Sequence, residues 1–543
     1  MKGQMCYNNA MKPINTSIFD FPSLISGGYV YVDKTMQIYE LVKPNSDRIY
    51  FFPRPRRFGK SLLISTLKAL FQGRRELFRG LAIEKTDWDW EHEVYPVLHL
   101  DMSVVAARDP VVFEQNLGKM MEIKCAEFGV PYDPNVIAAT NFEVLLTALS
   151  EKSTSADGKY VLLIDEYDSP IAGMLDTAER RAKLDEIRAM LHDFYVKAKA
   201  HCGDMRLLMV TGVSKFAKTS IFSAFNNPVD LSLDARAADL VGYTHEEMET
   251  YLHEHISAFA DKRGESYDAA FAELLAWYDS YQFSPEKLVK VINPVSLGRA
   301  LSTGVLKGYW EATAGSTLVY DALKAGDSSP FDLADEFGVN TLDAADALDA
   351  PAVALLYQGG YLTIDQRVDD EFVLLKIPNH EVRQALETGY VSRLLGKDFA
   401  IDAVVRTARR TAAQLAAEGY TDAFRTMLQS AYSLLPHDWV CKDEKEAKRY
   451  FIAYMCFARA EIAGEPQHAT GRPDAVLRTE KGIYVFEFKF AQSADAALRQ
   501  CRERNYAARF VGENLPVHYV GVNYNPAADV RTVDDVKCER AEG

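Results

Sequence analysis

Short apolar segments alternate with helical patterns through the first third of the chain, and this alternation restricts the fold more than any other feature of the sequence. Helical patterns such as 61–71 and 180–199 separate the apolar segments. Strands buried on both faces read as continuous apolar runs, and strands joined through helices pair in parallel. The sequence therefore predicts a parallel sheet covered by helices. The predicted strands are 49–52, 97–100, 161–164 and 207–210.

Two further parts follow. From about residue 242 one helical pattern succeeds another, as at 246–259 and 269–278. A helical stretch at 344–358 precedes an alternating hairpin pattern, which predicts a winged-helix-like unit, and more helix is expected over 383–435. The C-terminal part returns to α/β, and we expect domain boundaries that give 1–240, 241–435 and 436–543. Its predicted helices are 444–462 and 494–510, its strands lie near 474–478, 483–490 and 517–522, and the earlier hairpin is 361–364 with 372–377.

The charge distribution limits the classes of partner. The 543 residues carry a formal net charge of −16, yet residues 441–543 hold sixteen basic and sixteen acidic residues, so the acidic excess lies before them. Phosphate binding depends on many Lys and Arg contacts, so the chain is not expected to coat nucleic acid. Any contact with DNA has to use local basic patches.

The sequence also predicts the cellular compartment. No apolar run approaches the ~20 residues that a membrane span requires, and the first residues lack a signal-peptide core. The seven cysteines are scattered without a Cys-x-x-Cys pair, which argues against a disulfide framework and a thiolate zinc site. We expect a cytoplasmic, reduced protein with no membrane partner.

The first chemical motif follows the predicted strand 49–52 and opens a helix. Backbone N–H groups at such a helix N-terminus point at phosphate oxygens. In the run Gly59-Lys60-Ser61 the glycine permits close approach, the lysine suits β- and γ-phosphates, and the hydroxyl suits Mg²⁺. Arg54 stands where a general P-loop has its first glycine.

Two later strands end in polar residues. Asp165 and Glu166 follow strand 161–164; the first acid would support Mg²⁺ and the second would polarise an attacking water, unless both are solvated turn residues. Thr211 follows strand 207–210. Its hydroxyl would contact the γ-phosphate region or the attacking water, or else is bonded within its own turn.

Five separated motifs resemble the bacterial AAA-ATPase-like family over about residues 13–235. That family shares the non-glycine first position of the loop. The segments 279–283 and 293–296 echo a further family motif, but we predict only structural roles for them, and a helix cap for 379–383. The five motifs are Tyr-Val-Asp-Lys-Thr at 31–35, Pro-Arg-Pro-Arg-Arg-Phe-Gly-Lys-Ser at 53–61, Leu-Ile-Asp-Glu-Tyr-Asp at 163–168, Thr-Gly-Val-Ser-Lys-Phe at 211–216 and Phe-Ser-Ala-Phe-Asn-Asn at 222–227.

The resemblance implies an ATP site. It implies that Ser61 and Asp165 support Mg²⁺ and that Glu166 is the catalytic base. The roles of Arg56 and Arg57 stay open between phosphate contact, a finger acting in trans and solvation of the helix start; we favour phosphate contact, because a guanidinium adds bidentate donors. The residues expected to bind the nucleotide are Arg56, Arg57, Phe58, Gly59, Lys60, Ser61, Leu62, Asp165 and Thr211.

A second chemical motif lies near the C-terminus. The run Gly471-Arg472-Pro473-Asp474 begins a strand, and strand alternation over 483–490 puts Glu487 and Lys489 on one face and aromatic side chains on the other. Two carboxylates suit Mg²⁺, and a lysine beside them can orient or deprotonate a water. The alternative is a cross-strand salt bridge on a solvated face.

Pro-Asp, a twelve-residue interval, Glu-x-Lys and the flanking helices resemble the PD-(D/E)XK nuclease superfamily over about residues 444–523. Its core is a helix, a three-stranded meander, a helix and a strand. The resemblance implies an acid from the first helix, for which Glu446 fits best and Glu444 second, and a glutamine near the site, Gln500. It implies Asp474, Glu487 and Lys489 as catalytic residues, and Asp474, Glu487 and Glu446 as metal ligands.

Together these features predict an α/β protein: a P-loop NTPase parallel sheet of the additional-strand class, a mostly helical middle with a winged-helix-like unit, and a restriction-endonuclease-like domain. We expect an ATPase that controls a Mg²⁺-dependent nuclease acting on DNA, with the oligomeric state open. One alternative is an ATP-dependent switch whose C-terminal domain binds nucleic acid or protein without cutting, which suits that domain's neutral charge. Another is an ATP-driven scaffold or signalling protein.

Overall fold

The computed structural model groups the chain into two compact units. Residues 1–319 and 337–383 form the first, and residues 320–336 and 384–543 form the second, where sequence patterns predicted three parts. The helical middle is therefore divided between the two units. The structure describes residues 11–153, 155, 157–172, 183–215, 228–310, 336–342, 351–395, 401–432, 443–457, 461–463, 473–510, 512–513, 515–525 and 533–541.

A five-stranded parallel sheet forms the centre of the first unit, as predicted. The strand order is β2-β3-β4-β1-β5, and every neighbouring pair is parallel. β4 lies between β1, which leads into the phosphate-loop motif, and β3, which ends in the two acids. This is the additional strand that the sequence predicted. The strands are β1 (Ile49–Pro53), β2 (Val97–Asp101), β3 (Tyr160–Asp165), β4 (Met205–Gly212) and β5 (Val229–Asp230).

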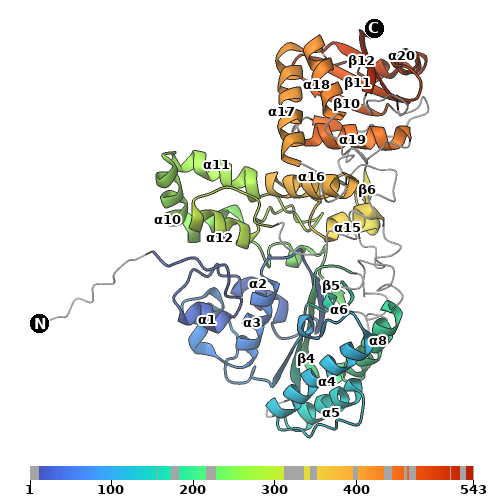
Figure 1. Cartoon of the computed structure of the whole chain (residues 1–543). Coiled ribbons are helices and arrows are strands. Elements are labelled where there is room, and N and C mark those ends of the chain that lie inside the picture. Colours follow the sequence, from blue (N-terminus) through green and yellow to red (C-terminus); the bar gives the residue numbers. More distant parts are fainter. Residues whose placement is uncertain are drawn as a thin grey trace, which may run out of the picture. The chain divides into compact units, whose positions relative to one another are not determined.

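Helices cover both faces of this sheet (Figure 1). On one face α3 lies against β2, β3 and β4. On the other, Leu162 and Ile164 of β3 pack with Phe142 and Phe194, whose rings stack at 4.1 Å between centroids. Burial on both faces explains why β3 reads as one apolar run. The helices are α1 (Phe21–Ser26), α2 (Thr35–Val42), α3 (Lys60–Phe71), α4 (Pro110–Glu127), α5 (Ala138–Glu151), α6 (Ser169–Ala172) and α8 (Leu184–Ala200).

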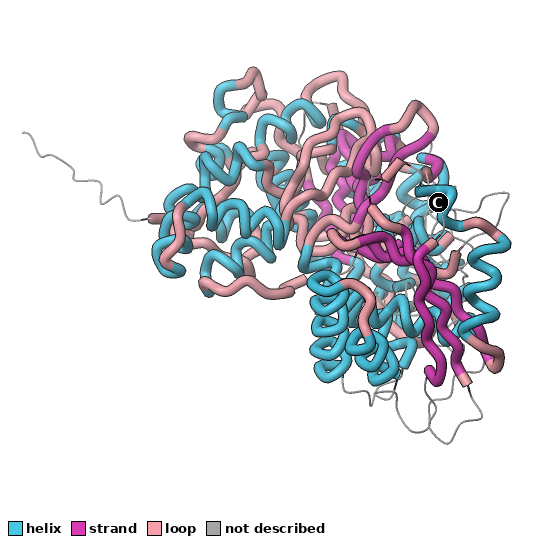
Figure 2. Tube along the Cα trace, turned by 90° about the horizontal axis from the view of Figure 1, so that it is seen from above, coloured by secondary structure: helices cyan, strands magenta, loops and turns pink. Residues whose placement is uncertain are grey.

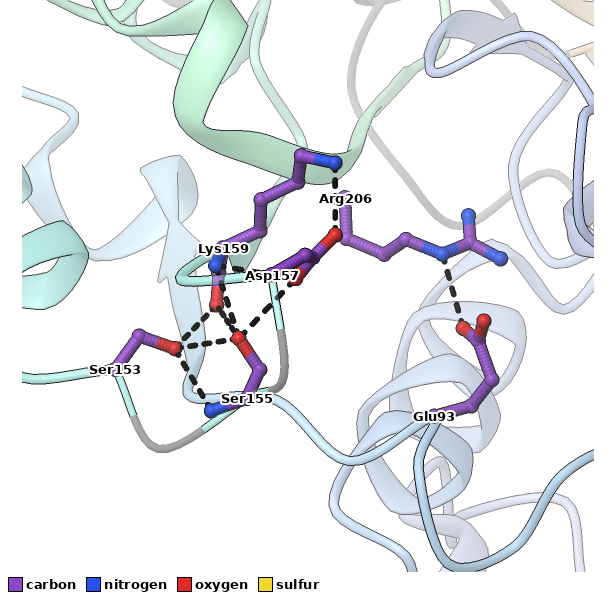
Figure 3. Close-up of polar contacts among 6 residues, drawn as sticks. All are labelled: Glu93, Ser153, Ser155, Asp157, Lys159 and Arg206. Carbon is purple, nitrogen blue, oxygen red and sulfur yellow. Dashed lines mark hydrogen bonds and ion pairs between the residues drawn. The ribbon is translucent and has the colours of Figure 1, made fainter.

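Hydrogen bonds and an ion pair stabilise the chain at the amino ends of β3 and β4 (Figure 3). Ser153 Oγ donates to the carbonyl of Lys159 at 2.6 Å, and the Lys159 amide donates to Ser155 Oγ at 2.9 Å. On β4, Arg206 Nε lies 2.9 Å from a carboxylate oxygen of Glu93. In a parallel sheet all carboxyl ends lie at the opposite edge, and ligand sites form there.

The helical part of the first unit ends in a small antiparallel sheet. Thr244 and Glu247 form a capping box at the start of α10, which fixes where this helix begins. The predicted hairpin is confirmed as β7 and β8, joined by β6 in the order β6-β8-β7. The winged-helix-like unit stays a prediction, and residues 344–350 of its predicted first helix lie outside the described residues. The elements are α10 (His245–Arg263), α11 (Tyr267–Tyr278), α12 (Pro294–Thr303), β6 (Phe337–Gly338), α14 (Val339–Leu342), α15 (Ala352–Gln358), β7 (Thr363–Arg367) and β8 (Phe372–Lys376).

A buried carboxylate fixes the start of α16 (His380–Leu395), the helix in which the first unit ends and the second begins. Glu381 is 1% exposed. One of its oxygens accepts hydrogen bonds from Ser296 Oγ at 3.1 Å, from the Trp310 amide at 2.7 Å and from the Tyr309 amide. The Asn379 side chain accepts from the Val382 amide and so caps the helix, as predicted.

The second unit contains a mixed five-stranded sheet in the order β13-β12-β11-β10-β9, seen beside the C label in Figure 2. β9, β10 and β11 form an antiparallel meander, α20 follows, and β12 pairs in parallel with β11. This is the predicted order of helix, meander, helix and strand. The elements are α17 (Ile401–Glu418), α18 (Asp422–Tyr432), α19 (Glu444–Phe457), β9 (Glu461–Ala463), β10 (Ala475–Thr479), β11 (Gly482–Phe490), α20 (Ala494–Glu503), β12 (Val517–Tyr524) and β13 (Val533–Arg540).

Three details of this unit differ from the sequence prediction. The helix predicted over 494–510 ends at Glu503, and residues 506–510 form a separate 3-10 helix. The helix predicted to reach residue 462 is wrong at its end, because residues 461–463 pair with β10 as a strand, with Ile462 opposite Leu477. β13 was not predicted, because its charged sequence gives no apolar run; it pairs with β12 at the edge of the sheet. Within the described part of the chain, no helix is long and apolar enough to cross a membrane.

Glu381 gives the first unit a predicted pH dependence. Burial raises the pKa of its carboxyl to about 7, although its three hydrogen bonds and the charge of Arg57 act in the other direction. The folded protein then keeps a proton that the unfolded chain releases near 4.5. The free energy of unfolding should therefore fall as pH rises from 4.5 to 7, by at most about 3 kcal/mol.

Tryptophan fluorescence reports on the first unit, which contains Trp88, Trp90, Trp277 and Trp310. Denaturant unfolding followed by this signal at several pH values measures how the free energy of unfolding depends on pH. Glu381→Gln should flatten this dependence between pH 4.5 and 7. Glu273→Gln, at an exposed position on α11, is the control and should keep it. An equal slope in wild type and Glu381→Gln would contradict the assignment.

Candidate functional site

The phosphate-loop motif connects β1 to α3 at the carboxyl edge of the parallel sheet. Arg57 has φ 67° and Gly59 has φ 101°, so the backbone turns through the left-handed region twice within three residues. Such turns point successive N–H groups toward one centre and favour an anion there. Gly59 immediately precedes α3, whose N-terminal dipole adds to this preference.

Lys60 points into this loop. Its side chain is buried, and Nζ donates to the carbonyls of Arg54 at 2.8 Å and Pro55 at 3.0 Å. Burial lowers the pKa of Lys60 to about 8, while Asp165 and Glu166 are among the carboxylates that raise it. The ammonium group therefore lies between loop carbonyls and the acids at the end of β3.

Asp165 is buried at the carboxyl end of β3. Its Oδ1 accepts from Thr211 Oγ1 at 2.5 Å and from the Glu166 amide at 3.0 Å. No residue in the described ranges donates a hydrogen bond to Oδ2, which leaves that oxygen for a cation. Thr211 is fully buried, and its hydroxyl is used on Asp165. The structure thus favours an orienting role for Thr211 over direct phosphate contact.

Glu166 follows Asp165 with φ 50°, a conformation that costs energy for a residue with a side chain. Burial and the neighbouring Asp165 raise the pKa of its carboxyl, and Lys60 opposes them. A glutamate with a raised pKa is a stronger base than one in water. The strained backbone, the acid pair and Lys60 all gather at this edge of the sheet.

Asp168, the last residue of the motif at 163–168, was expected to cap the next element rather than to join the Mg²⁺ region, and its side chain instead bonds the segment after β4. Its carboxylate accepts from the Ser214 amide at 2.9 Å, from Ser214 Oγ at 2.7 Å and from the Val213 amide at 3.2 Å. Tyr167 OH donates to the Ser214 carbonyl at 2.6 Å. These contacts fix the segment after β4 to the end of β3. Phe216 and the motif at 222–227 lie outside the described residues.

Arg54, which replaces the first glycine of a general P-loop, is a structural residue. It is 2% exposed, and its guanidinium lies over the rings of Phe52 and Phe283. The same group bonds four carbonyls and so connects the end of β1 to the segment after β5. Those carbonyls belong to Pro53 at 2.9 Å, Leu231 at 3.2 Å, Ser232 at 2.9 Å and Ala237 at 2.9 Å.

The helical part of the first unit also holds the loop. Arg57 donates to the Tyr309 carbonyl, and Asn293 Nδ2 donates to the Arg56 carbonyl at 3.2 Å. Phe58 is buried against Tyr281, with 4.8 Å between ring centroids. The remaining predicted residues, Ser61 and Leu62, lie half-buried in the first turn of α3.

An apolar pocket lies beside the loop. Gly59 and Leu62 form one wall, Tyr31 comes from the segment before β1, and Val241 and Val295 come from the helical part. Apolar pockets that adjoin a few polar groups are typical small-molecule sites. Here the polar neighbour is the anion-favouring loop.

The second predicted site lies on β10 and β11. Asp474 immediately precedes β10; its amide donates to the Phe486 carbonyl at 3.1 Å, and its Oδ2 accepts from the Phe488 amide at 2.8 Å. Extending the register of Ala475 with Phe486 by one residue places Asp474 opposite Glu487. Residues directly opposite on antiparallel strands have neighbouring side chains, so the two predicted carboxylates lie together.

Lys489 completes this group. Its Nζ lies 3.3 Å from Glu487 Oε1 and 3.3 Å from Glu444 Oε1, and it donates to the Phe488 carbonyl at 2.7 Å. Burial lowers its pKa, but the carboxylates outweigh burial and raise the pKa of Lys489 above its ordinary value. The first-helix acid that reaches the lysine is thus Glu444, which sequence analysis ranked behind Glu446.

Glu487 is 2% exposed, and Gln500 Nε2 donates to its Oε1. Its Oε2 is buried with no hydrogen-bond partner in the described part of the structure. Burial and Asp474 raise the pKa of this carboxyl. An uncompensated carboxylate oxygen beside a second carboxylate fits a hard divalent cation such as Mg²⁺.

The described residues contain no group of three or more His, Cys, Asp and Glu side chains arranged to hold a metal ion. Mg²⁺ commonly binds through one or two carboxylates and keeps water or substrate oxygens in its other positions. The pair of Asp474 and Glu487 meets that requirement. Gly471 and Arg472 of the same motif lie outside the described residues.

Comparisons with known proteins agree with both motifs. A family model described as a predicted AAA-ATPase matches residues 15–222, and a PD-(D/E)XK nuclease superfamily model matches residues 442–533. An Azotobacter chroococcum relative, described as an uncharacterized protein in the vnfD 5′ region, is 30% identical over 508 residues, which cover 92% of this chain and 93% of the relative. The chain belongs to the predicted AAA-ATPase family.

In this predicted AAA-ATPase, replacing Arg54 should destabilise the first unit. Arg54→Met keeps an apolar stem but removes the guanidinium donor from four carbonyls, of which the Ala237 carbonyl keeps the Leu240 amide at 3.5 Å. Each unpaired buried polar group costs about 1–3 kcal/mol, so we expect a loss of at least about 3 kcal/mol in the free energy of unfolding. Urea denaturation measures it. Arg236→Met, at a half-exposed position close by, is the control and should cost less than about 1 kcal/mol. Equal stability of the two variants would disprove the structural role of Arg54.

Proposed function

We propose that this protein binds and hydrolyses ATP in its first unit and that this reaction controls a Mg²⁺-dependent nuclease in its second unit, with DNA as the substrate. The observation that carries the proposal is the assembly of both predicted groups. Lys60, Asp165 and Glu166 gather at one edge of the parallel sheet, and Asp474, Glu487 and Lys489 gather on β10 and β11.

In the proposed ATP site the loop amides and Lys60 bind the β- and γ-phosphates. Ser61 and Asp165 would hold Mg²⁺, which would neutralise phosphate charge. Glu166 accepts the proton of the attacking water, a role that its raised pKa supports. The apolar pocket beside Gly59 takes the nucleoside base. Arg56 and Arg57 add donors at the loop.

In the proposed nuclease site Asp474 and Glu487 would hold Mg²⁺, which would polarise a phosphate oxygen. Water attacks phosphorus and gives up a proton to solvent, the P–O bond to the leaving oxygen breaks, and that oxygen takes a proton from solvent water. The raised pKa of Lys489 keeps its amine protonated at neutral pH. The lysine is therefore suited to orient the water and stabilise negative charge rather than to remove a proton. Gln500 holds the Glu487 carboxylate in place.

The ATP proposal predicts distinct effects for two substitutions. Lys60→Ala should weaken ATP binding about 10- to 100-fold, because a charge-assisted contact with phosphate contributes about 1.5–3 kcal/mol. Glu166→Gln should retain ATP binding and slow turnover by about 10²- to 10⁴-fold. Fluorescent-nucleotide titration and phosphate release measure the two properties.

Lys68→Ala is the matched control, because Lys68 lies two turns further along α3. It should bind and hydrolyse ATP as wild type does. Normal hydrolysis by Lys60→Ala would show that the phosphate site is assigned wrongly.

The nuclease proposal predicts that the purified protein cuts plasmid DNA in the presence of Mg²⁺ and that ATP changes the rate. Asp474→Ala and Lys489→Ala should each reduce cleavage by at least about 10²-fold, since each removes a group that binds the cation or stabilises charge at phosphorus. Gel assays with and without ATP measure both effects, and Lys481→Ala, in the exposed turn between β10 and β11, is the control.

If the protein shifts the mobility of DNA but cuts it under none of the conditions, the non-cutting switch is favoured instead. That alternative draws support from the neutral charge of residues 441–543. Cleavage that survives in Asp474→Ala would place the reaction at a different site or in a contaminant.

A further inference from the structure

The proposed nuclease site contains a second lysine that no motif predicts. Lys448 lies on α19, one helical turn after Glu444, and its Nζ is 3.0 Å from Asp474 Oδ1. Residues four apart on a helix share a face, so α19 presents an acid and a base to the same group. Glu444 pairs with Lys489, and Lys448 pairs with Asp474.

The Lys448 ammonium group pairs with the Asp474 oxygen that a metal ion would use. Asp474 Oδ2 accepts a hydrogen bond from the Phe488 amide, so Oδ1 is the oxygen through which Asp474 can bind a metal ion. Lys448 pairs with that same oxygen. Two positive charges on one carboxylate oxygen repel each other, and the repulsion is strong where water is partly excluded. Only 15% of the Asp474 side chain is exposed.

We propose that Lys448 is a built-in counterion that competes with Mg²⁺ for Asp474 and, when displaced, turns its ammonium toward the phosphate backbone of the substrate. The inference rests on the proposed nuclease function. Lys448 has the freedom to move, because its stem is flexible and 27% of its side chain is exposed. It acts through Asp474 and is therefore a positioning residue.

The proposal predicts opposite changes in two affinities. Without the ammonium group, Asp474 Oδ1 no longer has a competing charge, so a divalent cation should bind about fivefold more tightly, as expected from losing one partly exposed ion pair. The same substitution removes a positive charge that would contact the phosphate backbone, so DNA should bind about fivefold more weakly. A merely structural lysine would weaken both.

Titration calorimetry with Mn²⁺ alone, on the full chain without nucleotide or DNA, is the first test. The C-terminal site is defined as the part of the signal that Asp474→Ala removes. Lys448→Gln and Lys448→Ala should both lower its dissociation constant about fivefold, and Lys448→Arg, which keeps the charge, should match wild type. Lys481→Gln removes a charge from the same unit and should also match wild type.

The outcomes separate this inference from the proposed function. If wild type shows no Mn²⁺ signal that depends on Asp474, the proposed metal site fails and the inference fails with it. If wild type binds Mn²⁺ but Lys448→Gln and Lys448→Ala bind it equally or more weakly, the inference is overturned while the proposed function stands. Circular dichroism of each variant establishes that it is folded, and either neutral variant suffices for the comparison.

A second measurement uses a short DNA duplex and Ca²⁺ in place of Mg²⁺. Lys448→Gln should bind the duplex about fivefold more weakly than wild type and Lys481→Gln. In cleavage assays the Mg²⁺ concentration for half-maximal rate should fall for Lys448→Gln, together with the maximal rate. Unchanged duplex binding in Lys448→Gln would overturn the second half of the proposal.

Discussion

A buried ammonium group at the carboxyl edge of the parallel sheet is the interaction on which the first unit depends. Lys60 is largely removed from water, which is unfavourable for its charge, and the cost is offset in part by two loop carbonyls and by the acids at the end of β3. The strand order makes this compensation possible. β4 lies between β1 and β3, and its Thr211 fixes the Asp165 carboxylate that attracts the lysine.

The second unit buries a negative charge, where the first unit buries a positive one. Glu487 is almost fully buried and has an oxygen without a hydrogen-bond partner in the described structure, while Asp474 stands opposite it. Lys489 and Lys448 supply the compensation, each paired with an acid from a different element. A buried charge that is only partly compensated costs stability, and such costs are concentrated where a ligand completes the set.

Much of this arrangement could be predicted from the sequence, for identifiable reasons. β3 was predicted within one residue at each end, because a strand buried on both faces is apolar throughout. β13 could not be predicted, since a charged edge strand depends on pairing with β12. The motifs predicted Lys60, Asp165 and Glu487 as site residues. They ranked Glu446 before Glu444, and the structure places Glu444 at 3.3 Å from Lys489 Nζ. Residues two apart on a helix face opposite sides, so the choice requires knowing which face of α19 packs on β11.

The segments to which sequence analysis assigned only structural roles are the supports of the phosphate loop. Asn293 caps the start of α12 and donates to the Arg56 carbonyl; Phe283 packs on Arg54. Glu381, at the start of α16, bonds the amides of Tyr309 and Trp310, and the Tyr309 carbonyl accepts from Arg57. A loop without the usual first glycine thus owes its shape to residues more than two hundred positions away. A motif defined by nine consecutive residues cannot contain that information, because the constraint arises only when the helical part folds against the sheet.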